Sequence, residues 1–238
     1  MSLEKTAKKR SGFSETLRTL IYAVVVAFVI RTVGFEPFNI PSGSMIPTLL
    51  VGDYLFVSKY AYGYSRYSVP LGPPIVKDRL FGSVPARGDV AVFKLPKDNS
   101  TDFIKRVIGL PGDRIQVRNG VLHINEEPVK RRRIEDFVST DFYGRKVSTP
   151  QYLETLPNGI TYKTLDSNFE SLADNTGVYE VMPGHIFMMG DNRDDSQDSR
   201  FSQVGQVPIR NFVGRAEFLF FSIDSWDIRF SRLFDKIR

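Results

Sequence analysis

The chain has 238 residues, of which 42% are hydrophobic and 25% charged, and this usage is typical of a globular protein rather than a disordered, collagen-like or coiled-coil chain. It contains no cysteine, which excludes disulfides, zinc–thiolate sites, iron–sulfur clusters and a cysteine nucleophile. Its two histidines, His123 and His185, are the only residues on which a histidine-based triad or metal site could be built.

The net charge of +5 comes from the two ends of the chain. Residues 1–18 carry a net charge of +3 and residues 226–238 a net charge of +2, so the residues between them balance. A nucleic-acid-binding protein usually has a basic face on its folded body, and no nucleic-acid partner is therefore expected. The N-terminal basic stretch precedes an apolar run, which favours contact with membrane lipid.

Residues 1–16 are predicted to form a basic cytoplasmic N-terminus and residues 17–35 a transmembrane anchor. Twelve uncharged residues separate Arg18 from Arg31, whereas a span needs roughly 20, but both arginines can extend their charged heads towards opposite membrane surfaces. A cleavable secretory signal is one alternative, although no small-x-small cleavage site follows. A buried core helix is another, which the preceding basic residues disfavour. The positive-inside rule places residues 36–238 on the outer side of the membrane.

Beyond the anchor, short alternating runs bounded by Gly, Pro and Asp predict a mostly β protein. The pair Asn119-Gly120 between two of these runs is typical of a type I′ hairpin turn. Residues 61–86 are rich in Tyr, Pro and Gly and are predicted to form a long loop. The predicted strands are Tyr54–Tyr60, Asp89–Leu95, Asp102–Ile108, Arg114–Arg118, Val121–Asn125, Tyr179–Met182, His185–Met189 and Val213–Ser222.

The β-rich core is predicted in two parts, residues 36–125 and 179–225. Residues 126–178 between them are polar and weakly patterned, and are predicted to be an insertion or a second small β subdomain. The run Lys130–Arg133 within them is interpreted as a solvated face, because acidic residues follow it. Residues 226–238 alternate basic with apolar side chains, and are predicted to be a basic amphipathic segment at a membrane interface.

The first segment that could carry chemistry is Pro41–Leu49, just beyond the anchor. Its Pro, Gly and two serines, Ser42 and Ser44, are typical of a tight turn with exposed hydroxyls. An ordinary Ser/Gly turn is the alternative. The position close to the membrane suits a substrate that is itself tethered there.

The second segment is Asp102–Asp113. In a strand, Phe103, Lys105 and Val107 share one face, so the Lys105 ammonium lies between an aromatic and a β-branched neighbour. Burial lowers the pKa of a lysine, and a neutral amine can act as a general base. The alternative is an edge-strand lysine whose head reaches water.

The third segment is Gly190–Arg200, whose acidic density raises the possibility of a calcium site. The EF-hand pattern is absent, because no frame supplies the required ligands with Gly at the sixth position and Glu at the twelfth. A self-neutralising polar loop is therefore predicted, in which Ser196 is held in place while Asp198 and Arg200 pair. No metal site is expected.

These three segments, in this order, resemble the motifs of the type I signal peptidases, also called leader peptidases. Pro41–Leu49 is similar to their nucleophile motif, Lys105–Asp113 to their general-base motif and Gly190–Arg200 to a late structural motif. Asp89–Phe93 is similar to the strand between the first two motifs. Each match alone is weak to moderate, but together they are specific, and they extend over most of residues 36–225.

The resemblance implies a membrane-bound serine endopeptidase that removes N-terminal signal peptides from exported preproteins after a small-x-small motif. It implies Ser44 as the nucleophile and Lys105 as its general base. Ser42 would donate a side-chain hydrogen bond to the oxyanion hole, beside the backbone N–H of Ser44. The residues implied to line shallow pockets for small substrate side chains are Phe38, Met45, Leu49 and Ile104.

The same resemblance implies that Ser196 hydrogen-bonds the Lys105 amine and that Asp198 and Arg200 form a supporting ion pair. It implies a β-rich catalytic core, no metal or cofactor, and signal peptides and membrane lipid as partners. The expected location is the bacterial cytoplasmic (inner) membrane, crossed once, with the catalytic domain outside. Some members of the family have two spans, and residues 126–178 match none of its motifs, which leaves the subfamily open.

Two other interpretations remain open at this point. Self-cleaving repressors also use a Ser–Lys pair, but they are soluble and linked to DNA binding. A membrane-anchored, non-catalytic β domain that acts as a binding or assembly factor would explain the anchor and the strands. It would not explain the serine pair or Lys105 beside Phe103.

Overall fold

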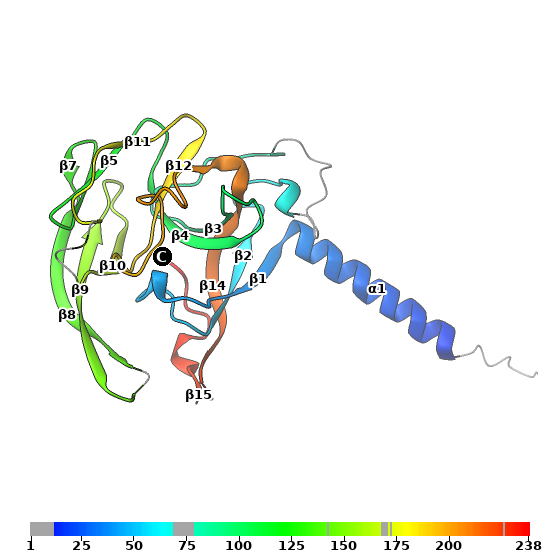
Figure 1. Cartoon of the computed structure of the whole chain (residues 1–238). Coiled ribbons are helices and arrows are strands. Elements are labelled where there is room, and N and C mark those ends of the chain that lie inside the picture. The colour runs from blue at the N-terminus through cyan, green and yellow to red at the C-terminus, as the bar shows by residue number, and fades with distance from the viewer. Residues whose placement is uncertain (1–11, 69–78, 142, 168–170, 172, 226) are drawn as a thin grey trace, which may run out of the picture.

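The structure is a computed structural model that describes residues 12–68, 79–141, 143–167, 171, 173–225 and 227–238. Helix α1 (Gly12–Val33) extends away from a body made of β-strands (Figure 1). It includes most of the predicted anchor but ends before Phe35, where the first strand begins. No helix among the described residues has the length and apolar character needed to cross a membrane.

Among the described residues, eight strands form the main sheet in the order β1-β2-β14-β3-β4-β12-β13, with β15 paired to β14. Every pairing in it is antiparallel. Register shifts along β14 let this long strand bend. The bounds are β1 (Phe35–Asn39), β2 (Asp53–Ser58), β3 (Val90–Lys94), β4 (Asp102–Gly109), β12 (His185–Met189), β13 (Val207–Pro208), β14 (Phe212–Asp224) and β15 (Asp227–Ile228).

Strand β3 is buried on both faces, which explains its nearly continuous apolar sequence. Val90 and Val92 pack into one core cluster together with the loop that follows β1. Ala91 and Phe93 face the opposite way and pack into a second cluster with side chains of β4, β12 and β14. Because the sheet has apolar layers on both sides, the strands that carry the site are held from two directions.

Two smaller sheets complete the body. One has the order β11-β5-β6-β7, with β5 (Arg114–Arg118), β6 (Val121–Ile124), β7 (Glu127–Pro128) and β11 (Tyr179–Glu180). Asn119 and Gly120 between β5 and β6 both have positive φ, 47° and 73°, as a type I′ turn requires.

All eight strands predicted from the sequence are present in the three sheets, with ends that differ by a few residues.

The third sheet has the order β10-β9-β8 and lies within residues 126–178, with β8 (Lys130–Thr140), β9 (Lys146–Thr155) and β10 (Thr161–Leu165). It is not an independent unit, since Leu156 and Tyr162 pack into the same buried cluster as Ile108 of β4 and Phe187 of β12. This shared core ties the third sheet to the strands of the site.

The prediction that Lys130–Arg133 is a solvated face is wrong for Arg131. Its guanidinium pairs with the buried Asp166 and lies 3.6 Å from the centre of the Tyr152 ring. A buried carboxylate and an aromatic face together provide a better environment than water for this one arginine.

The C-terminal segment is partly packed onto the body rather than free at its surface. Ile237 packs against the core, and Arg232 makes a 2.5 Å ion pair with the wholly buried Asp53. Phe230 and Phe234 remain exposed. Residues 69–78 of the predicted loop and Trp226 lie outside the described residues.

Candidate active site

The nucleophile candidate lies on a short 3₁₀ turn, Gly43–Met45, that follows β1. Ser44 is 7% exposed, and the residue after it, Met45, is completely buried in the core, as is Leu49. These apolar side chains hold the turn against the sheet. The sequence predicts that Met45 and Leu49 line a substrate pocket; neither has exposed surface in this structure, and that role stays a prediction.

Lys105 of β4 reaches this turn from the neighbouring part of the sheet. Its Nζ atom lies 2.6 Å from the Ser44 Oγ and donates a hydrogen bond to it, and it donates a second one of 3.0 Å to the carbonyl oxygen of Ile104. The lysine is 4% exposed, and its Nζ is 5.3 Å from the centre of the Phe103 ring. The structure thus brings together two residues 61 positions apart in the sequence.

Burial lowers the pKa of Lys105 from 10.5 to about 8. The shift is opposed by the nearby carboxylates of Asp198, Asp191 and Asp195. Near pH 8, an appreciable fraction of the amine is therefore neutral. In that form its lone pair can accept the Ser44 hydroxyl proton along the 2.6 Å contact, which is the arrangement of a nucleophile with its general base.

The loop Gly190–Arg200 lies beside this pair. Arg200 makes two 2.9 Å contacts with the carboxylate of Asp198, and both side chains are almost completely buried. Burial alone would raise the pKa of Asp198, but the Arg200 guanidinium and further hydrogen bonds hold it below its ordinary value. Asp198 and Arg200 form the ion pair that the sequence predicts.

Ser196 does not make the hydrogen bond predicted for it. Its hydroxyl donates to Asp198 Oδ2 at 2.8 Å, whereas the described hydrogen bonds of Lys105 go to Ser44 and Ile104. Ser196 nevertheless lines the same cleft as Lys105.

Two further residues connect the late loop to the nucleophile turn, and the sequence analysis did not assign them. Asn192 donates from its backbone to the Ser44 carbonyl and from its side chain to the Gly43 carbonyl, both at 3.1 Å. Gly190 has no room for a side chain, because a Cβ there would lie 2.2 Å from Ser196 Oγ and 2.6 Å from the Ser44 carbonyl oxygen. Both residues lie within Gly190–Arg200, so the family motif in this segment was the sequence signal that could have identified them.

A second buried ion pair, between Arg106 and Asp191, stabilises the site. Arg106, next to Lys105, donates to Asp191 at 2.8 and 2.6 Å and to the Gly88 carbonyl oxygen at 2.8 Å. Thr48 of the nucleophile loop also donates to Asp191. These bonds fix the two segments that carry Ser44 and Lys105 relative to each other.

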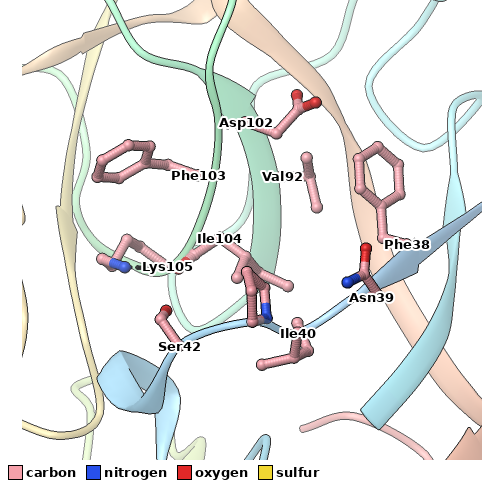
Figure 2. Close-up of a pocket in the computed structure, with 10 residues that line it drawn as sticks. Phe38, Asn39, Ile40, Ser42, Val92, Asp102, Phe103, Ile104 and Lys105 are labelled. Carbon is pink, nitrogen blue, oxygen red and sulfur yellow. Dashed lines mark hydrogen bonds between the residues drawn. The ribbon is translucent and has the colours of Figure 1, made fainter. Parts of the chain in front are cut away.

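A cleft opens between the end of β1 and the first half of β4 (Figure 2). Ser42 and Lys105 lie at one end of it, and Phe38 and Asp102 at the other. Phe38 and Ile104, which are predicted to line substrate pockets, both line this cleft and pack on the cluster that contains Met45. The Ser42 side chain is exposed and makes no capping hydrogen bond in the turn that follows it.

One group of carboxylates in the described part of the chain could hold a cation. Asp166, Asp174 and Asp194 place one oxygen each within 4.8 Å of one another. Arg131 already pairs with Asp166, and the proton transfer between Ser44 and Lys105 uses none of these three carboxylates.

Comparison with known proteins places the chain in a family. Residues 13–221 match the family described as signal peptidase, peptidase S26. Signal peptidase I of Rickettsia typhi is 40% identical over 230 residues, which cover 92% of this chain and 85% of that protein. Signal peptidase I of Rickettsia canadensis is 40% identical over 237 residues, covering 95% and 88%.

A crystal structure of a signal peptidase I from Enterococcus faecalis V583 aligns with 56% of this chain and 97% of its own, at 25% identity and a TM-score of 0.32. The family match excludes the non-catalytic β domain considered from the sequence. The chain belongs to the signal peptidase family, peptidase S26, and is a serine endopeptidase.

Proposed function

We propose that this protein removes N-terminal signal peptides from exported preproteins by cleaving after a small-x-small motif, with Ser44 as nucleophile and Lys105 as general base. The observation that carries the proposal is the buried 2.6 Å contact between Lys105 Nζ and Ser44 Oγ. The relatives at 40% identity are signal peptidases by name, which supports the substrate class.

In the proposed reaction, neutral Lys105 takes the hydroxyl proton as Ser44 Oγ attacks the scissile carbonyl carbon. The oxyanion that forms accepts hydrogen bonds from the Ser44 backbone N–H and the Ser42 hydroxyl. The C–N bond then breaks, and the Lys105 ammonium returns the proton to the leaving amine. Water, deprotonated by Lys105, attacks the acyl-enzyme and releases Ser44.

The apolar cleft supports the proposed preference for small residues on the acyl side. It is lined by Phe38, Val92 and Ile104 beneath two stretches of backbone, residues 39–42 and 102–105. Strand β1 is at the edge of the main sheet, and residues 102–105 of β4 pair only with β3. An extended signal-peptide end could add to these free edges by backbone hydrogen bonds, with its alternate side chains in the apolar cleft.

Membrane anchoring is the second element of the proposal. Large apolar side chains of α1 are exposed, among them Leu20, Val24 and Phe28. Where the helix joins the body, Phe35 contacts Phe56, Tyr60 and Phe218 in an aromatic cluster on the sheet. We propose that α1 lies in the lipid, with the N-terminus in the cytoplasm and the catalytic body outside.

Deleting residues 1–33 tests this second element, since β1 and every candidate site residue remain. The truncated protein is expected to stay active and to lose most of its affinity for phospholipid vesicles in a flotation assay. Unchanged vesicle binding would assign the lipid contact to the body instead of α1.

The first element is tested by incubating the detergent-solubilised full chain with a preprotein whose signal ends in Ala-x-Ala. The wild type is expected to cut at that bond. Ser44→Ala should abolish turnover because the covalent path is lost, whereas Ser148→Ala, on the exposed β8–β9 hairpin, should leave it unchanged. Turnover by Ser44→Ala within a few-fold of wild type would refute the nucleophile assignment.

A further inference from the structure

A second cleft adjoins the catalytic pair on the side away from the apolar cleft. Both clefts are lined by Ser42, Phe103 and Lys105, so these residues lie between them. The second cleft is more polar in its lining side chains. Its other lining residues are Ser44, Asp194, Asp195, Ser196, Gln197, Phe201 and Gln203.

The proposed function gives the two clefts different occupants. If the signal-peptide end fills the apolar cleft with its last carbonyl at Ser44, the chain must continue past Lys105 to leave the site. The second cleft is then where the first residues of the mature protein lie during acylation. It also receives the amine that leaves when the peptide bond breaks.

The charge of this second cleft is negative when the enzyme is active. Lys105 is the one cation among its described lining residues, and it must be neutral to act as a base. Two carboxylates remain, Asp194 and Asp195. Asp194 is engaged, because it accepts hydrogen bonds from the backbone and hydroxyl of Ser167.

Asp195 differs from Asp194 in two respects. Its side chain is exposed to solvent, and none of the hydrogen bonds or ion pairs of the described residues involves its carboxylate. Its position is nevertheless close to the reacting atoms, because its Oδ2 lies 3.1 Å from where a Cβ on Gly43 would be. Gly43 is the residue between Ser42 and Ser44.

We propose that Asp195 sets a charge preference for the first two residues of the mature protein, favouring a lysine or arginine there and disfavouring an aspartate or glutamate. The inference rests on the proposed function and adds a substrate class to it. A unit charge about 6–8 Å away at a partly solvated surface changes the rate by roughly three- to tenfold at low salt. A substrate ammonium can also form an ion pair with the Asp195 carboxylate, which makes no hydrogen bond or ion pair within the described residues.

The test uses three preproteins that share one Ala-x-Ala signal and differ only at the second mature residue, which is Lys, Gln or Glu. For the wild type at low ionic strength, kcat/KM is expected to follow Lys > Gln > Glu, with roughly a ten- to hundredfold spread between the extremes. In Asp195→Asn, the spread should shrink to within about twofold. Because each ratio compares substrates on one enzyme, any change in the ionisation of Lys105 cancels.

Asp102→Asn is the matched control, since Asp102 is a carboxylate that lines the apolar cleft and pairs with Lys94. It should leave the Lys-to-Glu ratio unchanged. Raising the salt concentration should reduce the wild-type ratio, which keeps the test valid even if a variant folds poorly. If the enzymes cleave the substrates but Asp195→Asn does not alter the ratio of kcat/KM for the Lys and Glu substrates, this inference alone is overturned. If the wild type does not cut the Gln substrate, the proposed function is overturned together with this inference.

Discussion

Replacing Lys105 with Met should stabilise the protein below pH 8 and lose that advantage at alkaline pH. The pKa of the buried lysine is about 8 instead of 10.5, and this difference corresponds to about 3 kcal/mol of unfavourable free energy for burying the ammonium. Between those two values the unfolded chain binds more protons than the folded one, so wild-type stability rises with pH through this window. Below pH 8 both states are protonated and the full penalty applies.

Methionine has a similar length and no charge, so the substitution removes the penalty without creating a large cavity. It also removes the hydrogen bonds to Ser44 and Ile104, each worth about 1 kcal/mol. The expected net effect is a gain of about 1 kcal/mol at pH 6 and a loss of similar size at pH 10. The sign of the difference should therefore reverse with pH.

Urea denaturation of the detergent-solubilised protein at pH 6 and pH 10 measures this reversal. Lys130→Met is the control, because Lys130 is exposed on β8 and the same chemical change there removes no buried charge. A Lys105→Met protein that is less stable than wild type by the same amount at both pH values would refute the reasoning. Lys105 would then be buried without a shifted pKa.

Three further substitutions test individual parts of the site. Ser42→Ala should lower kcat about 10²–10³-fold with little change in KM, because an oxyanion exists only in the transition state and intermediate; a loss carried mainly by KM would make Ser42 a substrate-positioning residue. Lys105→Arg should be as inactive as Lys105→Ala, since arginine keeps the charge but cannot lose its proton, and substantial activity in the folded variant would exclude the general-base role. Gly190→Ala should destabilise the protein by about 1–3 kcal/mol, since its Cβ would meet Ser196 and the Ser44 carbonyl; Gly177→Ala, which meets nothing within 4 Å, is the matched control in thermal denaturation.

The parts of the fold that the sequence predicts are those with a local physical signal. The Asn119-Gly120 turn is specified by two residues that tolerate positive φ. Strands such as β3 are apolar enough to stand out between polar turns. In each case, the interactions that determine the element lie within a few residues of it.

Strands β8 and β9 lack such a signal, because β8 has no buried residue in its 11 positions. Its polar sequence gives no apolar alternation, and its pairing with β9 depends on partners distant in the sequence. The packing of the C-terminal segment was not predictable for a related reason. Its contacts are with Asp53 and Thr48, and no local pattern in residues 226–238 encodes partners so far away.

The site was predictable in its residues but not in all of its contacts. The three motifs identify Ser44, Lys105 and the Asp198–Arg200 pair, and the structure brings them together. Motifs do not encode depth, so they do not reveal that Met45 is completely buried. They do not encode individual side-chain contacts either, such as the hydrogen bond from Ser196 to Asp198.

The central claim, that neutral Lys105 activates Ser44, is tested most directly by the pH dependence of kcat/KM for wild-type cleavage of an Ala-x-Ala preprotein. This parameter reports ionisations of the free enzyme, and the Lys105 amine has a pKa of about 8. We expect kcat/KM to fall about tenfold per pH unit on the acid side, with a single ionisation near pH 8. A value of kcat/KM that stays constant from pH 6 to pH 9 would contradict the account, because no group with the pKa of this lysine would then control the reaction.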